Sequence, residues 1–204
     1  MRITVGVPKG GAGKTTTAVH LAIGLSATGR TLLVDTDPDQ HAAVDWSNRA
    51  VDWPSDRCTV IADQSRNLRR NVEPLARGFE HVIFDTGAKN EETLRQAMNL
   101  SDYLIVPSKG TDGDLLELPK VFRIAAEVDI SHPIRPLVLL TQIRGGTNED
   151  NDARSYLEEL ELPVFDTSIP LLRQFGQMRF TPLHLGEYSD VIDELFAMDK
   201  EVSA

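Results

Sequence analysis

Short runs of consecutive apolar residues recur along this chain of 204 residues, and amphipathic stretches of helix length separate them. The apolar runs cover residues 3–7, 31–35, 58–62, 81–85, 102–107 and 136–141, with a weaker run at 163–167. Because the runs are continuous rather than alternating, they predict strands buried on both faces, as in a parallel sheet. The stretches between them predict helices over residues 14–27, 40–50, 65–77, 90–100, 113–128, 149–160 and 170–179, with a last one at 187–199. This alternation predicts one doubly wound α/β domain over residues 1–204, with a mostly parallel sheet and helices on both faces.

Composition narrows the class of protein. With 21 basic and 31 acidic residues the net charge is −10, so a nucleic acid or anionic lipid must meet a local basic patch. A single cysteine, Cys58, leaves no intrachain disulfide to form, which favours a reducing cytoplasm. No apolar run approaches the roughly 20 residues of a membrane helix, and residues 1–10 lack the form of a signal peptide. We therefore expect a cytoplasmic protein without a membrane partner.

A glycine-rich stretch follows the first apolar run, at the end of the sheet where ligands bind in such folds. It contains Gly10, Gly11, Ala12, Gly13, Lys14, Thr15 and Thr16. Glycines let backbone amides turn inward around phosphate oxygens, and the following helix points its positive end at them. The pattern predicts a phosphate-binding loop, with Lys14 on the β- and γ-phosphates and the Thr15 hydroxyl on Mg²⁺.

Carboxylates follow two further runs. Asp35 and Asp37 end the second run, and Asp85 ends the fourth. Beside a phosphate loop, Asp35 and Asp85 are candidates to hold Mg²⁺, and Asp37 is the candidate to orient an attacking water. The alternative for the first pair is an acidic turn in which Asp39 caps a helix, and for Asp85 it is a strand end that faces solvent.

These motifs resemble the ParA family of segregation ATPases, P-loop NTPases with a deviant Walker A motif. The similarity is greatest to its short, ParF-like members, which lack an N-terminal DNA-reading domain. The matching stretches are KGGAGKTT, VDTDPDQ, HVIFDTGA, SDYLIVPSKGTDGD, PLVLLTQI and FDTSIPLLRQF, in family order. The chain departs from the family pattern at Asp39, which is inserted in DPDQ, and at FTPLHLG before the final helix.

The resemblance implies roles that the spacing alone does not give. Lys9 would cross a homodimer interface to the ATP of the other subunit, and Asp114 would meet that lysine. Ile169 and Pro170 would seat the adenine, with Thr141 and Gln142 nearby. The activity implied is weak ATP hydrolysis with Mg²⁺, stimulated by a ParB-like adaptor. The ATP-bound dimer would hold nonspecific DNA and so associate with the nucleoid.

Two sets of arginines are candidates for DNA contact. Arg69 and Arg70 share one side of a predicted helix with Arg66 and Arg77, while Leu68, Val72, Leu75 and Ala76 take the opposite side. Pro74 must kink or end that helix. Arg173 and Arg179 follow the predicted adenine loop, where the family places basic residues. A merely solvated face is the alternative for the first set, and a surface or intramolecular arginine is the alternative for Arg173.

Other features favour packing. His20 lies among apolar residues of a predicted helix and is expected to be structural, and the remaining histidines show no metal-ligand spacing. The polar face of residues 187–199 is acidic and would be repelled by anionic lipid. Besides partition of a plasmid or chromosome, two functions stay open. They are the positioning of a protein cargo and a metabolic P-loop enzyme such as an ATP-dependent ligase.

Overall fold

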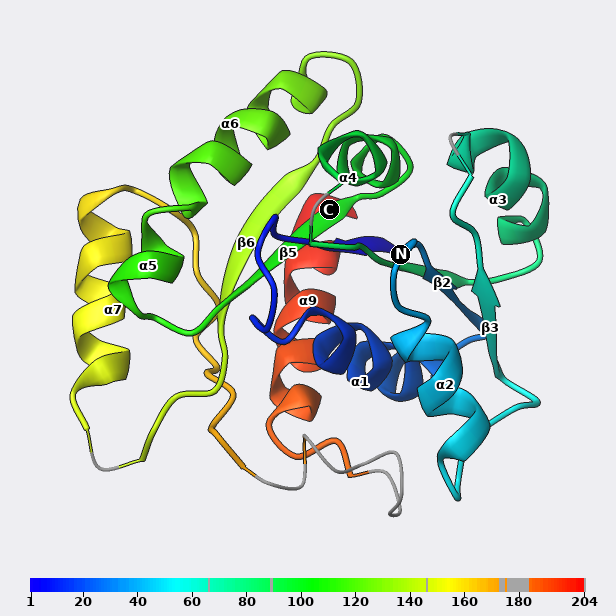
Figure 1. Ribbon diagram of the computed structural model, residues 1–204, viewed down its shortest axis with the longest axis horizontal. Coiled ribbons are helices and arrows are strands. Elements are labelled where there is room, and N and C mark those ends of the chain that lie inside the picture. The colour runs from blue at the N-terminus through cyan, green and yellow to red at the C-terminus, as the bar shows by residue number, and fades with distance from the viewer. Residues whose placement is uncertain (66, 89, 146, 173–174, 176–183, 204) are drawn as a thin grey trace.

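Within the described residues, six parallel strands form one sheet at the centre of the protein (Figure 1). The computed structural model describes residues 1–65, 67–88, 90–145, 147–172, 175 and 184–203. The strands are β1 (Arg2–Val5), β2 (Thr31–Asp35), β3 (Cys58–Ala62), β4 (His81–Asp85), β5 (Tyr103–Ser108) and β6 (Arg135–Leu140). Their order is β3-β2-β4-β1-β5-β6, and all neighbouring pairs run parallel. The six strong apolar runs therefore form strands as predicted, and the α/β fold class is confirmed.

The weak seventh run at 163–167 does not become a strand of this sheet. It contributes an isolated bridge from Val164 to Val138 on β6, and a second bridge joins Pro170 to Ile143. Between these bridges the chain follows the end of β6 loosely. This segment lies beside the candidate site described below.

Helices occupy most of the stretches that the pattern assigned to them. They are α1 (Lys14–Ser26), α2 (Ala42–Arg49), α3 (Leu68–Ala76), α4 (Glu91–Met98), α5 (Asp112–Leu115), α6 (Leu118–Asp129), α7 (Glu149–Glu159) and α9 (Tyr188–Ser203). The helix predicted over 113–128 is split into α5 and α6. Pro119 lies in the first turn of α6, where its missing N–H is tolerated, and α6 starts there afresh. Of the helix predicted over 170–179, residues 173, 174 and 176–179 lie outside the described residues, and its predicted start is wrong because 170–172 are not helical and Pro170 forms a bridge.

The helix α3 differs from its prediction at both ends. It begins at Leu68 because Asn67 caps it, with the Asn67 side chain accepting a hydrogen bond from the Arg70 amide. Pro74 lies inside the helix, which ends two residues later at Ala76. Leu75, which the pattern placed opposite the arginines, is 53% exposed, whereas Leu68, Val72 and Ala76 are buried.

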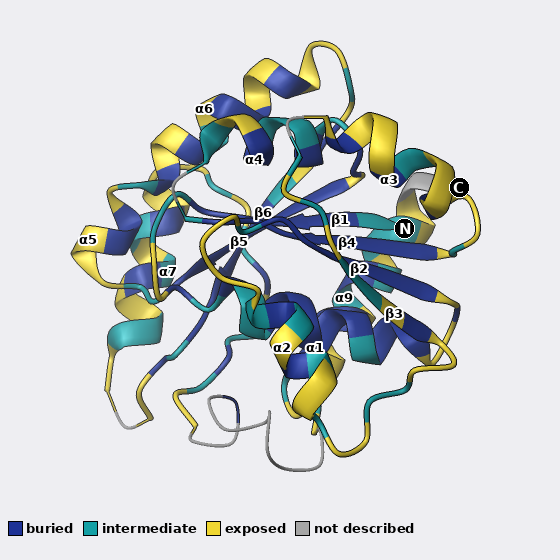
Figure 2. Ribbon diagram, turned by 45° about the vertical axis from the view of Figure 1, so that its right-hand side comes forward, coloured by how far each residue is buried: buried dark blue, intermediate teal, exposed yellow. Residues whose placement is uncertain are grey.

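Two layers of helices cover the sheet (Figure 2). The helices α1, α2 and α9 pack on one face, and α3, α4, α6 and α7 pack on the other. Successive strand residues supply the two cores in turn, so Ile105 faces α1 and α9 while Leu104 and Val106 face α6 and α7. Burial on both faces explains why the strand sequences read as continuous apolar runs.

Candidate nucleotide-binding site

The glycine-rich loop joins β1 to α1 in the conformation that its glycines permit. Gly11 has φ 74° and Gly13 has φ 93°, both in the left-handed region where a side chain is strained. Gly13 immediately precedes α1, so the loop ends at the positive end of that helix. Gly10 and Gly11 are exposed, which leaves this backbone open to a ligand.

Lys14 folds back over the same loop. Its ammonium donates a hydrogen bond to the Lys9 carbonyl oxygen at 2.7 Å, and only 8% of the residue is exposed. Burial lowers the pKa of Lys14, while the nearby carboxylates of Asp85 and Asp37 oppose that effect. A buried cation at the mouth of an open loop is suited to an anionic ligand such as a phosphate group.

Asp85 lies at the same edge of the sheet. Its strand β4 sits between β1 and β2, and Asp85 is paired in register with Val5 and with Asp35. The carboxyl group is 2% exposed, accepts a side-chain hydrogen bond from Thr15, and leaves its Oδ1 without a hydrogen-bond partner. Burial raises the pKa of Asp85 to about 7.

The unpartnered Asp85 oxygen is the observation that fits a metal ion. A buried acceptor without a donor is costly, and a cation beside the Thr15 hydroxyl would satisfy it. No cluster of three or more His, Cys, Asp or Glu side chains that could hold a metal occurs in the described part of the chain. The single carboxylate of Asp85 beside the Thr15 hydroxyl suits Mg²⁺, which proteins bind through one or two carboxylates together with phosphate oxygens and water.

Asp35 has a different environment from Asp85. Its Oδ2 accepts hydrogen bonds from the amides of Ala43 and Val44 in the first turn of α2, at 3.0 and 3.3 Å. Its Oδ1 accepts one from the Asp37 amide at 3.2 Å. The carboxylate is buried and stabilises the N-terminus of α2, so a role as metal ligand stays a prediction for this residue.

Asp37 lies across from Gly87 at the rim of the site. A β-carbon on Gly87 would come within 3.2 Å of the Asp37 carboxyl carbon, so the close approach depends on glycine. Asp37 Oδ1 accepts hydrogen bonds from the amides of Asp39 and Gln40, at 2.9 and 3.2 Å. The amide of the inserted Asp39 is therefore held by Asp37, and the N-cap residue of α2 is His41, with no side-chain capping hydrogen bond. A cleft of about 800 Å³ separates Asp37 from the P-loop residues Gly10, Gly11, Gly13 and Thr15.

The second lysine of the loop lies on its outer side. The Lys9 ammonium is 2.5 Å from Asp114 Oδ1, and their side chains are 35% and 5% exposed. The Thr111 hydroxyl donates to the other Asp114 oxygen at 2.9 Å. The structure thus pairs Lys9 with the carboxylate that the resemblance assigned to it, and the action of Lys9 across a dimer stays a prediction.

A smaller pocket of about 210 Å³ adjoins the cleft. Its lining consists of Gly13, Thr16, Thr141, Gln142, Ile169, Pro170, Leu171, Leu172, Phe175 and Tyr188. The Thr141 hydroxyl donates to the Ala12 carbonyl oxygen at 2.9 Å, and the Gln142 side-chain amide donates to that of Gly11, also at 2.9 Å. These bonds fix the end of β6 against the P-loop, so Ile169 and Pro170 lie beside it. Their contact with adenine stays a prediction.

The inner wall of this pocket is aromatic, which sequence reasoning missed. Tyr188 begins α9, and its hydroxyl hydrogen-bonds the Thr17 hydroxyl of α1 at 3.1 Å. His20 stacks on Tyr188 with ring centroids 4.4 Å apart and lies 5.2 Å from the Phe175 ring. Burial lowers the pKa of His20 to about 4, so it is a neutral packing residue, as its apolar neighbours indicated. No local signal marks Tyr188, because it reaches the pocket from the start of the distant helix α9, whereas Phe175 follows Leu172 of the same pocket by three residues.

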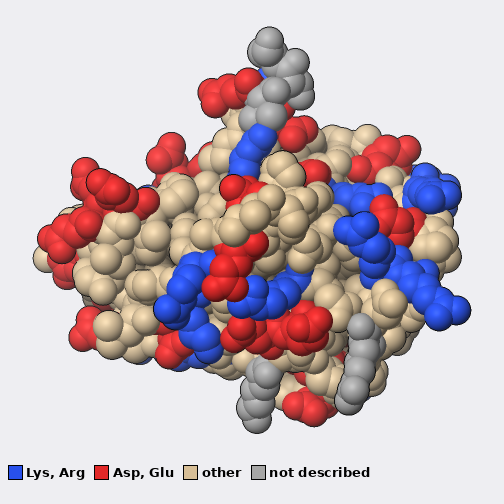
Figure 3. Space-filling view, turned by 90° about the horizontal axis from the view of Figure 1, so that it is seen from above, with Lys and Arg blue, Asp and Glu red and all other residues tan. Residues whose placement is uncertain are grey.

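The candidate DNA contacts are only partly described. Arg69, Arg70 and Arg77 are exposed on or just after α3, and the Arg69 guanidinium donates to the Asn99 carbonyl oxygen at 3.2 Å. Figure 3 shows Lys and Arg side chains toward the end of the molecule that carries α3 and a second group left of the centre, with Asp and Glu side chains among both. Three more arginines, Arg66, Arg173 and Arg179, lie outside the described residues. Across the described ranges, no helix is long and apolar enough to span a membrane.

Comparison with known proteins agrees with this geometry. The family model of the CobQ/CobB/MinD/ParA nucleotide binding domain matches residues 3–178. Maintenance of carboxysome distribution protein A from Gloeobacter kilaueensis is 32% identical over 164 residues, which cover 79% of this chain and 72% of that protein.

Two solved structures share the fold. The apo form of McdA from Cyanothece has a TM-score of 0.76 at 16% identity and covers 92% of both chains. A plasmid partition protein from Borrelia burgdorferi B31, bound to AMPPNP, has a TM-score of 0.73 at 17% identity and covers 97% of this chain and 98% of its own. The chain belongs to the CobQ/CobB/MinD/ParA family of nucleotide-binding domains.

Proposed function

We propose that this protein is an ATP-driven molecular switch whose active state is a dimer with the nucleotides between its subunits. The protein is an ATPase that uses Mg²⁺, in keeping with the family to which it belongs. The proposal concerns what the ATP does. It holds two copies together until hydrolysis releases them.

The residues divide the work of holding and cleaving the triphosphate. Amides of the P-loop and the positive end of α1 bind the phosphates, and Lys14 neutralises the β- and γ-oxygens. Thr15 and Asp85 would hold Mg²⁺, which when bound offsets the charge of the phosphates. Asp37, at the rim of the cleft, would accept a hydrogen bond from the attacking water and orient it. Asp35 keeps α2, and with it the wall of the cleft, in place.

One observation carries the dimer proposal: two lysines of the same loop point to different places. Lys14 is buried against its own loop, whereas Lys9 is a third exposed and is held by the nearly buried carboxylate of Asp114 in α5. The Lys9 ammonium is bonded to Asp114 of α5, and Lys9 is not among the residues that line the cleft beside Lys14. A cation presented at the outer side of an open loop can instead meet negative charge on a second subunit, as an arginine finger does.

The exposed arginines of α3 support a role for DNA. A monomer that offers two or three cations binds DNA weakly at physiological salt, and a dimer doubles the phosphates contacted. We therefore propose that the dimer holds nonspecific DNA, and that a ParB-like adaptor on a plasmid or chromosome triggers hydrolysis and release. The Borrelia partition protein of the same fold supports this choice of cargo.

A protein cargo is the second candidate. It is favoured by the 32% identity to a protein named for carboxysome distribution. The ATP-dependent dimer and its DNA contact would be the same in both cases. The cargo and its adaptor would differ.

The test is sedimentation with ADP and with a non-hydrolysable ATP analogue, followed by titration of arbitrary duplex DNA across a salt series. We expect a dimer only with the analogue, and DNA binding by the dimer that falls as salt rises. Arg69→Glu/Arg70→Glu should weaken that binding, while the exposed Arg123→Glu of α6 serves as the matched control. A monomer with the analogue, or ATP turnover that requires a small-molecule substrate, would overturn the switch. A dimer that ignores DNA at low salt would favour the protein cargo.

A further inference from the structure

The chain beyond the edge strand β6 leaves the sheet for three residues just before the predicted adenine loop. The Phe165 amide donates to the Val138 carbonyl oxygen at 3.0 Å, and regular contact with the strand resumes where the Ile169 amide donates to Leu140 at 2.8 Å. Phe165 and Ile169 are buried, at 0% and 2% exposure. The segment 166–168 therefore bridges two anchored points, and other groups satisfy its backbone.

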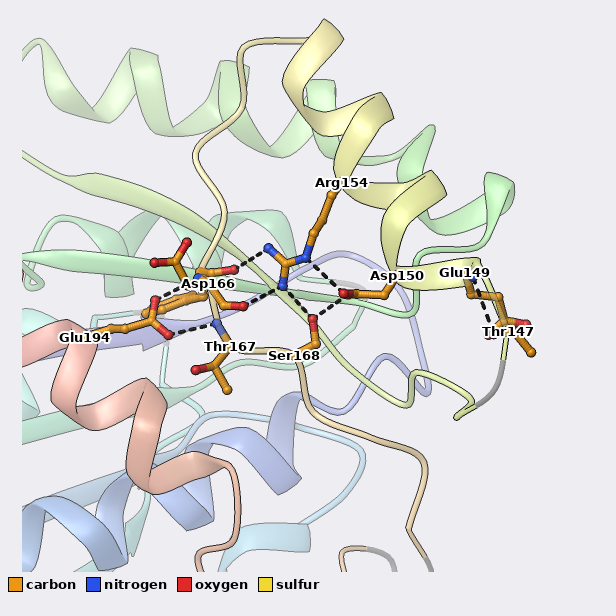
Figure 4. Close-up of polar contacts among 9 residues, drawn as sticks. Thr147, Glu149, Asp150, Arg154, Asp166, Thr167, Ser168 and Glu194 are labelled. Atoms are coloured by element: carbon orange, nitrogen blue, oxygen red, sulfur yellow. Dashed lines mark hydrogen bonds and ion pairs between the residues drawn. The ribbon is translucent and has the colours of Figure 1, made fainter.

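Arg154 of α7 supplies the donors on one side. Its guanidinium donates to the carbonyl oxygens of Phe165 and Asp166, at 2.9 and 2.8 Å, and to the Ser168 hydroxyl at 2.7 Å. Asp150, one turn earlier on α7, accepts from the Arg154 Nε at 3.0 Å and from the Ser168 hydroxyl at 2.5 Å. Figure 4 shows the guanidinium between α7 and the segment, with Asp150 and Ser168 closing the network.

Glu194 of α9 supplies the acceptors on the other side. Its two carboxylate oxygens accept from the amides of Asp166 and Thr167, each at 2.8 Å (Figure 4). Arg154 and Glu194 thus replace the strand that would otherwise pair with this backbone. One side chain binds the carbonyl oxygens, the other binds the amides, and both are charged, which makes such bonds short and directional.

Arg154 and Glu194 together form a clamp on the segment 166–168. This segment leads directly into Ile169 and Pro170, which form one wall of the pocket beside the P-loop. Immediately after Ser168, the Ile169 carbonyl oxygen accepts from the Ile143 amide at 3.1 Å, and Leu171 donates back to Ile143 at 2.8 Å. Ile169 and Pro170 line the pocket beside the P-loop. A shift of the segment 166–168 would move this wall relative to Thr141 and Gln142, which are bonded to the P-loop itself.

We propose that Arg154 and Glu194 are positioning residues for the nucleotide base. They touch no phosphate group, and they set where the Ile169–Pro170 wall stands, which determines the affinity for adenine and its selection over other bases. The proposal rests on the placement of the base in this pocket. It predicts that substitution of Arg154 or Glu194 lowers the affinity for the base and does not change the affinity for the triphosphate. The reason is that Thr141 and Gln142, at the end of β6, hold the P-loop by hydrogen bonds of their own.

The test compares ATP with Mg²⁺ tripolyphosphate, which carries the phosphates without a base. Both are measured by displacement of a fluorescent nucleotide from wild type, Arg154→Gln and Glu194→Gln. Arg154→Gln should weaken ATP about tenfold, the loss expected when bonds to a charged group are removed, and should leave tripolyphosphate within about twofold. Glu194→Gln keeps shape and one acceptor, so its loss should be smaller, and GTP should be discriminated less well by both.

The matched control is Arg95→Gln on α4. Arg95 also bonds a carboxylate four residues earlier, Glu91, but lies away from the pocket. It should leave both ligands unchanged, and thermal unfolding without nucleotide checks that all variants fold. Arg154→Lys keeps the positive charge but cannot donate to several acceptors from one planar group. Its ATP affinity should lie between those of wild type and Arg154→Gln.

The outcomes separate the clamp from the pocket on which it rests. Equal affinity of wild type for ATP and for tripolyphosphate would show that the pocket holds no base. That result would contradict the placement of adenine beside Ile169 and Pro170. If wild type binds ATP more tightly than tripolyphosphate, and Arg154→Gln does so by the same factor, the base is held in the pocket. The positioning role of Arg154 is then contradicted. Equal loss of both ligands in a folded Arg154→Gln would also overturn it, because the effect would not be confined to the base.

Discussion

The two halves of the candidate site are built in different ways. The phosphate half is local: residues 10–16 are one continuous stretch of loop and first helical turn, and the carboxylates lie at the ends of strands that meet at the same edge. The base half is assembled from the end of β6, the segment 166–171, Phe175 and the start of α9, and side chains of α7 and α9 hold it. Backbone turns and strand ends specify geometry through nearby residues, whereas a clamped loop depends on distant ones. Single substitutions should therefore act strongly in the first half and by degrees in the second.

The largest effect is expected at Lys14. Lys14→Ala should abolish measurable ATP binding, because the variant loses the buried cation that faces the β- and γ-phosphates. Isothermal titration with ATP and Mg²⁺ measures this, with Lys120→Ala as the control lysine on α6. Near-normal ATP affinity in Lys14→Ala would contradict the assignment of residues 10–16 as the phosphate-binding loop.

Asp37 comes next, since it acts on turnover rather than on binding. Asp37→Ala should keep ATP affinity and lower hydrolysis on the order of 10²-fold, as expected when a water-orienting group is lost. Asp39→Ala is the matched control, because Asp39 contributes its amide to Asp37 and keeps it in the variant. Hydrolysis at the parent rate would assign the water to another residue.

Substitution of Asp85 by Asn should raise the stability of the nucleotide-free protein and weaken its function. Burial raises its pKa from 3.8 to about 7, so the folded nucleotide-free protein holds a proton that the unfolded chain releases. Stability therefore falls as pH rises from about 4 to about 7 and is level above that. Asp85→Asn cannot ionise, so it should be more stable than wild type above pH 7, by roughly 1–3 kcal/mol, and similar to it near pH 4.

The same substitution should weaken Mg²⁺-dependent ATP binding, because it removes the carboxylate placed beside Thr15. Denaturant unfolding of the nucleotide-free protein at several pH values, with ATP titrations alongside, measures both effects. A variant that is less stable than wild type over the whole range would contradict the cost assigned to the buried Asp85 charge.

The smallest effect is expected in the base half, at Ser168. Ser168→Ala removes one hydroxyl that bridges Arg154 and Asp150 but leaves the backbone bonds of Arg154 in place. ATP affinity should fall only by a few-fold, the scale of one net hydrogen bond. Loss as large as that of Arg154→Gln would show that the network, rather than the guanidinium, positions the wall.

The same contrast explains what sequence predicts here and what it does not. Apolar runs predicted six strands, and the turn chemistry of Gly11 and Gly13 predicted the loop, because both depend on neighbours in the chain. The bonds from Asp35 to Ala43 and Val44 could not be anticipated, since they depend on where α2 docks. The predicted helix over 113–128 is split because Pro119 is tolerated in the first turn of a helix and not in its interior, so α6 begins there. Tyr188, at the start of α9, carries no local mark of a pocket.

The most direct test of the central claim concerns Lys9. Its ammonium is bonded to Asp114, and Lys9 does not line the cleft beside Lys14, so we propose that its phosphate contact is made on a second subunit. Lys9→Ala should bind ATP with normal affinity as a monomer and fail to dimerise with a non-hydrolysable analogue in sedimentation velocity. Lys109→Ala, another lysine beside Gly11, is the control. Full analogue-dependent dimerisation of Lys9→Ala would contradict the trans role and with it the proposed switch.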